Sequence, residues 1–223
     1  AIIGVGLIGG SLARAMKDRG LAGRITGAGR SRENLELALK LGVIDRLGQG
    51  AAGAVEGADL VVLASPVGTF EELVREVSGQ LKPGAILTDV GSVKGALVRR
   101  IEDLLPAGVQ YVPAHPIAGK EKHGVAESSS SLFQGAKCIV TPTERTDPAA
   151  CSALWNAVGA TVVVMKPDLH DHIFGAVSHL PHAAAYALVN AVASYTEGTD
   201  NYITFSGAGF RDFTRIAASS PEM

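Results

Sequence analysis

The glycine-rich segment at residues 4–9, GVGLIG, constrains the fold of this chain more than any other feature. It closes a short apolar run and opens a helical pattern, which is the order found where a strand turns into a helix around a dinucleotide. In that arrangement Gly4 allows a tight turn, Gly6 lets a pyrophosphate approach the backbone, and Gly9 lets helix and strand pack closely. A plain glycine-rich turn is the alternative, but the flanking strand and helix patterns favour dinucleotide binding.

Short β-branched runs alternate with helical patterns over the first three quarters of the chain. The runs lie at residues 1–5, 24–28, 60–64, 85–90, 111–114, 137–141 and 161–165. Because they are apolar throughout, they predict parallel strands that are covered by helices on both faces. Asp147 and Pro148 predict the start of one helix, and Gly159 predicts its end. We therefore predict an α/β fold with a Rossmann-type, doubly wound, mainly parallel sheet, forming a dinucleotide-binding domain over residues 1–166.

A different pattern begins after Lys166. Residues 170–194 are typical of one long, alanine-rich helix, and Pro181 inside it lacks the amide that would bond the Val177 carbonyl, so we expect a kink there. We predict that residues 167–223 begin a second, helical domain. Between the two patterns, the serine-rich residues 127–131 predict a mobile loop.

Composition argues against several classes of protein. The formal net charge of −2 gives no basic surface for nucleic acid or an anionic membrane, and no apolar run reaches the roughly 18 residues of a spanning helix. Cys138 and Cys151 have the surroundings of buried thiols rather than of a disulfide pair, and the histidines lack the spacing of metal ligands. We expect a cytoplasmic protein, although the apolar start at Ala1 neither indicates nor excludes a signal peptide upstream.

The residues after the second predicted strand bear on the choice of cofactor. An NAD site usually has an acidic residue there for the ribose diol, but this chain has Gly29 followed by Arg30, Ser31 and Arg32. Two cations and a hydroxyl suit a 2′-phosphate, so we expect NADP to be favoured, with NAD possible. The alternative is that both arginines belong to a solvated turn beside an unselective pocket.

Further candidates follow the later strands, because ligands of open α/β sheets bind beyond the carboxyl ends of the strands. Ser65 and Pro66 end one apolar run. Ser92 follows another, either as a hydroxyl in the cleft or only as the cap of a helix that begins near Lys94. His115 follows the next run and should lie at the same rim, where an imidazole can take a proton from an alcohol as hydride leaves. A purely structural histidine is the alternative.

Five segments, taken in order, resemble the motifs of prephenate/arogenate (cyclohexadienyl) dehydrogenases. They are GVGLIGGS at residues 4–11, DVGSVK at 89–94, HPIAG at 115–119, SHLPH at 178–182 and GFRDFTR at 209–215. The resemblance covers essentially the whole chain, but that family continues for several helices beyond the position of Met223, which implies a C-terminally incomplete chain. It also implies a small-molecule substrate and a homodimer formed through the helical domain, with no nucleic-acid or membrane partner.

The resemblance implies oxidative decarboxylation of prephenate or arogenate, with hydride transfer to NAD(P), to give 4-hydroxyphenylpyruvate or tyrosine in tyrosine biosynthesis. By position, His115 becomes the group that accepts the proton of the ring hydroxyl, and Ser92 helps to orient it. His182 lines the substrate pocket and favours prephenate. Arg215 binds a substrate carboxylate.

Other positions carried over from the family are less specific. Glu121 lies near the mouth of the site, and His179 is either a substrate-binding residue or a core histidine. Arg211 is interpreted as a surface or subunit-contact residue. Taken together, the residues predicted to bind the cofactor are Gly4, Gly6, Leu7, Ile8, Gly9, Arg30, Ser31, Arg32, Ser65, Pro66 and Ser92.

Two other functions remain open at this point. A β-hydroxyacid dehydrogenase or a reductase of small imino acids would have the same architecture, although such enzymes commonly use a lysine on the helical side. A module that senses a dinucleotide without turnover would not need both a base and a pocket for an anionic substrate.

Overall fold

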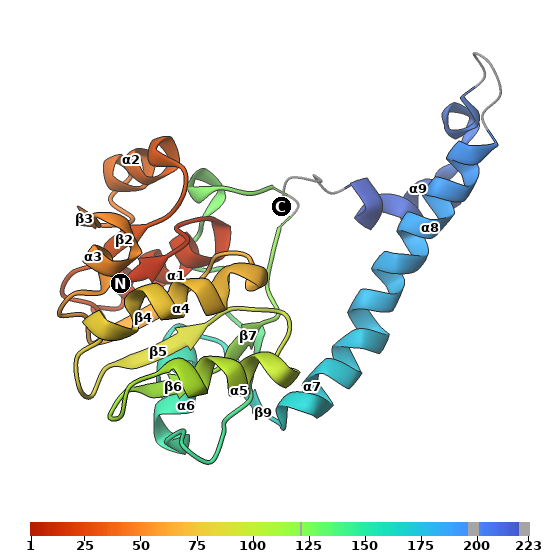
Figure 1. Cartoon of the computed structure of the whole chain (residues 1–223). Helices are drawn as coiled ribbons and strands as arrows, with labels where there is room; N and C mark the ends of the chain where they lie inside the picture. The colour runs from red at the N-terminus through yellow and green to blue at the C-terminus, as the bar shows by residue number, and fades with distance from the viewer. Residues whose placement is uncertain (121, 196–200, 219–223) are drawn as a thin grey trace. The chain divides into compact units, whose positions relative to one another are not determined.

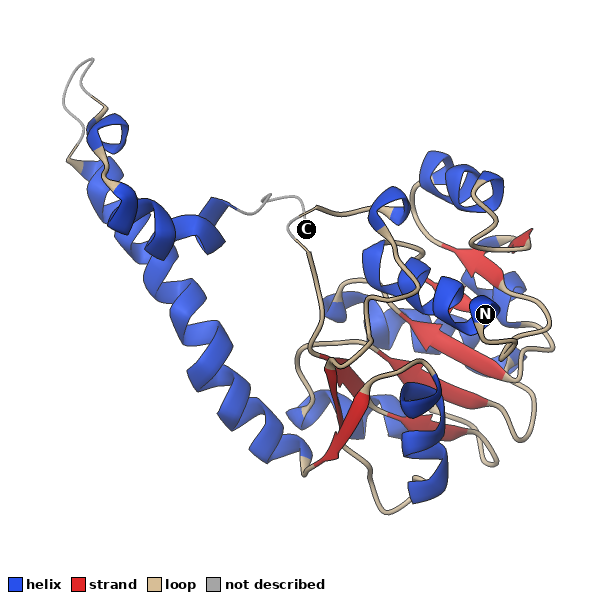
Figure 2. Cartoon of the chain, turned by 180° about the vertical axis from the view of Figure 1, so that it is seen from behind, coloured by secondary structure: helices blue, strands red, loops and turns tan. Residues whose placement is uncertain are grey.

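The computed structural model describes residues 1–120, 122–195 and 201–218, and the chain divides into two compact units, Ala1–His170 and Asp171–Met223. The first unit contains a six-stranded sheet with the order β3-β2-β1-β4-β5-β6, in which every pair is parallel (Figures 1 and 2). Its strands are β1 (Ile2–Ile3), β2 (Thr26–Ala28), β3 (Arg46–Leu47), β4 (Leu60–Leu63), β5 (Ile86–Asp89) and β6 (Gln110–Val112). The strand order reverses between β1 and β4, where such sheets bind ligands.

Helices cover both faces of this sheet, which explains why its central strands β1 and β4 are apolar throughout. The helices are α1 (Leu7–Asp18), α2 (Arg32–Lys40), α3 (Gly50–Val55), α4 (Phe70–Val77), α5 (Gly95–Leu104) and α6 (Pro148–Ala157), with short 3-10 turns η1 (Val67–Thr69), η2 (Ser78–Gln80) and η3 (Val125–Glu127). Successive residues of a strand point to opposite faces. Accordingly, Ile2 packs in a core with α1, α2 and α6, and Ile3 packs in a core with α3, α4 and α5. The predicted doubly wound fold is confirmed.

The later strands form a second sheet instead of extending the first. These are β7 (Ala114–Pro116), β8 (Lys137–Val140) and β9 (Thr161–Val164), where β7 is antiparallel to β8 and β8 is parallel to β9. The run predicted as one strand at residues 111–114 is therefore divided at Pro113, which cannot donate to a strand ladder. The edge strand β3 was not predicted, because Arg46 and Leu47 form no apolar run.

The helix α6 begins and ends as predicted. The Asp147 carboxylate accepts the N–H of Ala149 at 2.8 Å, and Pro148 is the first helical residue. Gly159, just past the end of the helix, has a positive φ of 93°. Of the two cysteines, Cys138 is buried and free, whereas the side chain of Cys151 lies outside the described residues.

The serine-rich segment at residues 127–131, which the sequence predicts to be a mobile loop, forms hydrogen bonds with α1. The Nε of Arg14 donates to the Oγ of Ser128 at 2.8 Å. The N–H of Ser129 donates to the Oγ of Ser11 at 2.9 Å. These contacts join residues more than one hundred positions apart, so no local sequence pattern could indicate them.

A run of helices begins at the end of the first unit and continues into the second. Its members are α7 (Pro167–Phe174), the π-helical turn η4 (Gly175–His179) and α8 (Leu180–Ser194), followed later by η5 (Tyr202–Phe205), α9 (Ala208–Thr214) and η6 (Arg215–Ala218). The long helix predicted over residues 170–194 is thus present, and the π-helical turn lies just before Pro181, whose missing amide disturbs the regular bonding. None of the helices in the described part of the chain is long and apolar enough to cross a membrane.

Candidate active site

A cavity of about 830 Å³ lies beyond the carboxyl ends of β1, β2 and β4, next to the point where the strand order reverses. Among the predicted cofactor-binding residues, those that line it are Gly4, Gly6, Arg30, Ser31, Ser65 and Pro66. The other predicted cofactor-binding residues, all of them described, lie outside its lining: Leu7, Ile8, Gly9, Arg32 and Ser92. The structure therefore gathers about half of the predicted set around one cavity.

The three glycines of the GVGLIG turn have different physical roles. Gly4 has a φ of 98°, and a Cβ there would lie 2.5 Å from the carbonyl group of Ala64. A Cβ at Gly9 would lie 2.3 Å from the Gly4 carbonyl oxygen. At Gly6, by contrast, a Cβ would meet nothing within 4 Å, although this glycine lines the cavity. The fold itself therefore requires Gly4 and Gly9, whereas Gly6 leaves open space where a ligand could approach the backbone.

The two arginines after β2 differ in their surroundings. Arg30 is exposed and lines the cavity. The Nε of Arg32 donates to Glu36, one turn further along α2, at 2.6 Å. Ser31 is the N-cap of α2, because its Oγ accepts the N–H of Asn34 at 3.1 Å. Arg30 is therefore the better placed of the two cations for a ligand in the cavity.

Asn34 also lines the cavity and was not predicted. Its Nδ2 donates to the Val5 carbonyl oxygen at 2.7 Å, and its Oδ1 accepts the N–H of Val125 at 3.1 Å. The side chain thereby joins the glycine-rich turn to η3. Because both partners are backbone atoms far away in the sequence, no motif could have indicated this role.

His115 follows β6 of the main sheet by three residues, as the sequence predicts, but it also belongs to β7 of the second sheet, which was not predicted. It is half-buried, and its Nδ1 lies 2.8 Å from the Nε2 of His170, which is fully buried on α7. The two rings meet edge to face, with centroids 5.1 Å apart. A neutral imidazole has one donor and one acceptor nitrogen, so one ring donates to the other and the orientation of His115 is set. His170 was not singled out from the sequence.

Ser92 is exposed in the turn between β5 and α5. The interpretation of Ser92 as a helix cap is wrong, because α5 begins at Gly95 and the N-cap position, Lys94, has no side-chain cap hydrogen bond. The structure thus leaves the hydroxyl of Ser92 outside the helix start. Lys94 itself is fully buried, which the sequence pattern did not indicate.

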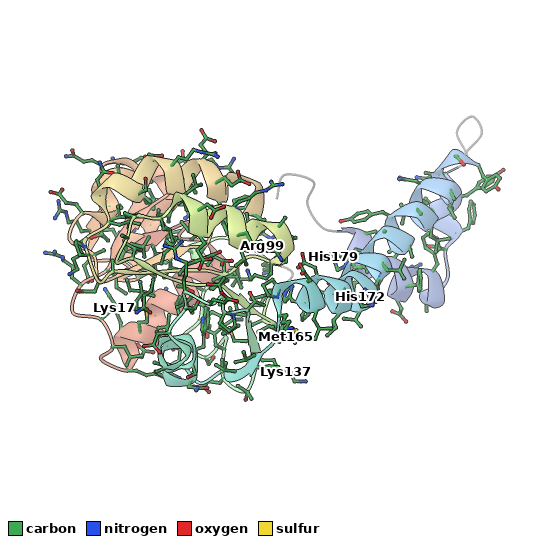
Figure 3. The ribbon with its side chains drawn as sticks, turned by 60° about the horizontal axis from the view of Figure 1, so that its bottom comes forward. Lys17, Arg99, Lys137, Met165, His172 and His179 are labelled. Carbon is green, nitrogen blue, oxygen red and sulfur yellow. The ribbon has the colours of Figure 1, made fainter. Side chains whose placement is uncertain are left out.

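The remaining predicted residues belong to the second unit or lie outside the described residues. His179 is exposed on the helical run, where Figure 3 labels it together with His172. His182 is exposed, and its Nδ1 donates to the Ser178 carbonyl oxygen at 2.8 Å. Arg215, the first residue of η6, is also exposed. Glu121 lies outside the described residues.

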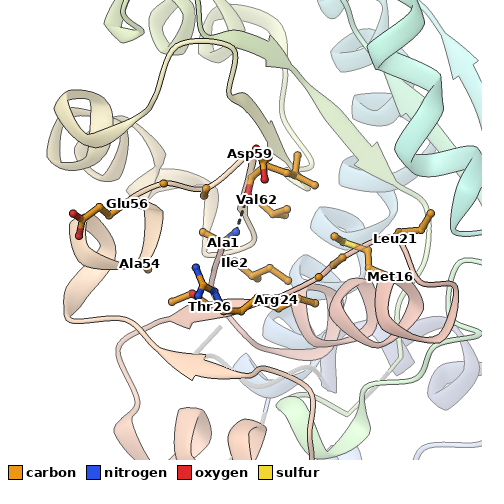
Figure 4. Close-up of a pocket in the computed structure, with 16 residues that line it drawn as sticks. Ala1, Ile2, Met16, Leu21, Arg24, Thr26, Ala54, Glu56, Asp59 and Val62 are labelled. Carbon is orange, nitrogen blue, oxygen red and sulfur yellow. Dashed lines mark hydrogen bonds between the residues drawn. The ribbon is translucent and has the colours of Figure 1, made fainter.

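A smaller cavity of about 360 Å³ lies at the opposite, amino-terminal edge of the sheet (Figure 4). Ala1, Arg24, Thr26 and Asp59 contribute to its walls. None of the predicted site residues that the structure describes lines it. Because parallel sheets bind ligands at the carboxyl ends of their strands, the larger cavity is the candidate site.

Comparison with known proteins gives consistent matches. Residues 12–164 match the family described as prephenate dehydrogenase, nucleotide-binding domain, and residues 166–223 match prephenate dehydrogenase, dimerization domain. Prephenate dehydrogenase of Bacillus subtilis is 38% identical, over 100% of this chain and 61% of that protein. Cyclohexadienyl dehydrogenase of Zymomonas mobilis is 35% identical, over 100% of this chain and 77% of that protein.

Among solved structures, the crystal structure of prephenate dehydrogenase from A. aeolicus in complex with hydroxyphenyl propionate and NAD+ superposes with a TM-score of 0.91 and 42% identity. The match covers 99% of this chain and 78% of that chain. The present chain spans less than two thirds of the length of the Bacillus subtilis relative.

Proposed function

This chain belongs to the prephenate dehydrogenase family, and we propose that its protein catalyses the oxidative decarboxylation of prephenate or arogenate in tyrosine biosynthesis, with hydride transfer to a nicotinamide cofactor. The observation that carries the proposal within the structure is the half-buried His115, whose ring is oriented by the buried His170 at 2.8 Å. It supplies a base of fixed direction in the same unit as the candidate cofactor cavity.

A nicotinamide dinucleotide fits the residues of that cavity. Gly6 leaves room for a pyrophosphate against the backbone, and the start of α1 offers N–H groups that no earlier carbonyl of the helix engages. Ser65 and Pro66 line the side formed after β4. When bound, the nicotinamide accepts the hydride from the carbinol carbon of the substrate.

In this proposal His115 takes the proton of the ring hydroxyl as carbonyl character develops at that carbon. A positioned base typically contributes about 10²–10⁴-fold to the rate. Ser92 helps to orient the hydroxyl or the histidine. Loss of carbon dioxide from the opposite ring carbon gives an aromatic phenol, so the protein needs to supply orientation, a base and a carboxylate anchor.

The substrate anchor is assigned to the helical domain. Arg215 grips a substrate carboxylate through two parallel hydrogen bonds. His182, whose Nδ1 donates to Ser178, presents Nε2 as its other polar atom and favours the keto acid prephenate. His179 and Glu121 are assigned to the substrate pocket and its mouth.

We further propose that NADP is preferred to NAD. The support is that the end of β2 lacks an acidic residue and that Arg30 lines the cavity next to Ser31. Arg32 adds charge nearby, although its Nε is engaged by Glu36. An arginine can form charge-assisted, bidentate hydrogen bonds with the 2′-phosphate of NADP. NAD lacks this phosphate and cannot make the contact.

We also propose that the dinucleotide-binding domain ends at Lys166 and that the helical domain from Pro167 onwards forms a homodimer. The match of residues 166–223 to a dimerization domain supports this arrangement. So do large apolar side chains in the second unit that this single chain leaves exposed, which include Val177, Leu180, Tyr195, Phe205 and Phe213.

The proposed function is tested by assaying the full-length protein with prephenate and with arogenate, each with NAD and with NADP, and following the reduced cofactor. We expect turnover of at least one ring substrate, and its loss in His115→Asn with the cofactor Kd unchanged. A β-hydroxyacid with the oxidised cofactors, and a cyclic imino acid with the reduced cofactors, serve as rival substrates. Cofactor binding without turnover of either ring substrate would contradict the proposal and favour a sensing module.

A further inference from the structure

A buried ion pair lies beneath the turn that carries Ser92. The Nζ of Lys94 lies 2.6 Å from the Oδ1 of Asp89, and neither side chain has any exposed surface. The hydroxyl of Tyr111, also buried, donates to the other carboxylate oxygen at 2.7 Å. The free energy lost when two charges leave water offsets much of their electrostatic attraction, so a contribution to stability does not by itself account for this pair.

The pair holds the two successive peptide groups that meet at Gly91. The N–H of Gly91 donates to the Oδ1 of Asp89 at 2.7 Å, and the Nζ of Lys94 donates to the Gly91 carbonyl oxygen at 2.7 Å. That carbonyl belongs to the peptide bond that leads into Ser92. The backbone between β5 and α5 is therefore held directly before the serine.

Packing around Gly91 leaves the turn little freedom to move. A Cβ at this glycine would lie 2.9 Å from the Val67 side chain and 3.0 Å from the Phe70 ring. The turn is thus closed on one side by η1 and α4 and on the other by the ion pair. A change in the ion pair would act first on the backbone of the buried Gly91, which leads directly into the exposed Ser92.

The same charges act on the thiol of Cys138, which lies on β8 beside the strand that carries His115. β7 packs beside β5, and in the second sheet Pro116 pairs with Cys138. Burial raises the pKa of the Cys138 thiol well above its usual range, while the charge of Lys94 and a hydrogen bond with the His115 backbone oppose this shift. Burial and the charge of Asp89 also raise the pKa of Tyr111, so its hydroxyl stays protonated as a donor.

We propose that Lys94, together with Asp89 and Tyr111, is a positioning residue for the dehydrogenase reaction. It holds the backbone at Gly91 so that the hydroxyl of Ser92 is presented in one direction. This inference rests on the function and on the role of Ser92 proposed above. Lys94 touches neither substrate nor cofactor in this scheme, and it carries no proton in the reaction.

The first test removes both charges together in the double variant Asp89→Leu/Lys94→Met, because apolar replacement of a whole buried pair is commonly tolerated. We expect kcat of the full-length enzyme to fall about 10- to 100-fold, as for a small misplacement of a reacting group, with the cofactor Kd unchanged. The matched control is Thr88→Val, which removes a buried hydrogen bond to the Val112 carbonyl from the same strand. It should lower Tm without lowering kcat.

The second test repeats the change in a Ser92→Ala background. If the ion pair acts through Ser92, its removal should cost little further activity there, so the two losses will not multiply. Should the double variant fail to fold, Tyr111→Phe replaces it, because this change keeps the ion pair and removes only the hydrogen bond to Asp89. Its effect on kcat, with and without Ser92→Ala, should follow the same pattern but be smaller. If the decreases in kcat caused by the double variant and by Ser92→Ala multiply in full, the inference is wrong. A folded double variant with wild-type kcat would also overturn it, and either result would leave the proposed function intact. A wild-type enzyme that turns over neither ring substrate would overturn the proposed function and this inference with it.

Discussion

Two alanine substitutions in the same glycine-rich turn should separate cofactor binding from folding. At Gly6 an added methyl group meets no atom of the chain within 4 Å, and the φ of −97° is negative, with ψ at −148° just beyond the β region, so alanine meets less backbone strain here than at Gly4. Gly6→Ala should therefore change the free energy of unfolding by only about 1 kcal/mol or less, because a lost N-cap glycine and a stiffer unfolded chain act in opposite directions.

The same methyl group projects where a pyrophosphate should approach the backbone. Losing one hydrogen bond to a charged group costs about 1.5–3 kcal/mol, which corresponds to roughly a 10- to 100-fold increase in the dinucleotide Kd. We therefore expect Gly6→Ala to melt near the wild-type temperature and to bind both NAD and NADP much more weakly.

Gly4→Ala is the matched contrast. A non-glycine residue held at a φ of 98° costs about 1–3 kcal/mol, and overlap with the Ala64 carbonyl group at 2.5 Å adds about 1–3 kcal/mol more. Against a total stability of roughly 5–15 kcal/mol, this variant should lose several degrees of Tm or fail to fold. Thermal melting and calorimetric titration with each dinucleotide measure both variants. A stable Gly6→Ala protein with wild-type Kd would refute the assignment of this turn to the cofactor.

Three further predictions concern the proposed site. His115→Asn should lower kcat by about 100-fold or more, with cofactor affinity little changed. In the wild-type enzyme, kcat should rise with pH to a plateau as a single proton is lost from the base. A flat profile would argue against His115 unless product release limits the rate. Arg215→Lys should raise the KM of the ring substrate strongly, and Arg215→Ala more so, while the cofactor Kd stays near wild type, because lysine cannot copy the bidentate grip of a guanidinium; a normal KM would remove Arg215 from the site. Arg30→Ala should raise the KM for NADP about 10-fold or more and leave the KM for NAD unchanged. Arg32→Ala is the control and should have a smaller effect, because Arg32 already pairs with Glu36. A wild-type enzyme that clearly prefers NAD would contradict the proposed preference for NADP.

Part of the candidate site was predictable because it depends on local backbone geometry. Gly4 and Gly6, together with Ser65 after β4, follow strands that the apolar runs located correctly. The partner of His115 was not predictable, since His170 lies 55 positions further along and has no motif of its own. Asn34 was missed for the same reason, because its side chain serves two distant backbone groups.

The sequence by itself determined the doubly wound fold, because apolar runs and glycine positions reflect short-range constraints that act on each segment separately. It also indicated the family through five ordered motifs. Only the tertiary structure decided that the strand predicted over residues 111–114 divides at Pro113 and that β7, which contains His115, pairs with β8 in a second sheet. Likewise, only the tertiary structure shows that Asp89 and Lys94 form an ion pair that is fully buried from solvent. Pairing and burial are properties of the whole packed chain, and a local pattern of residues does not contain them.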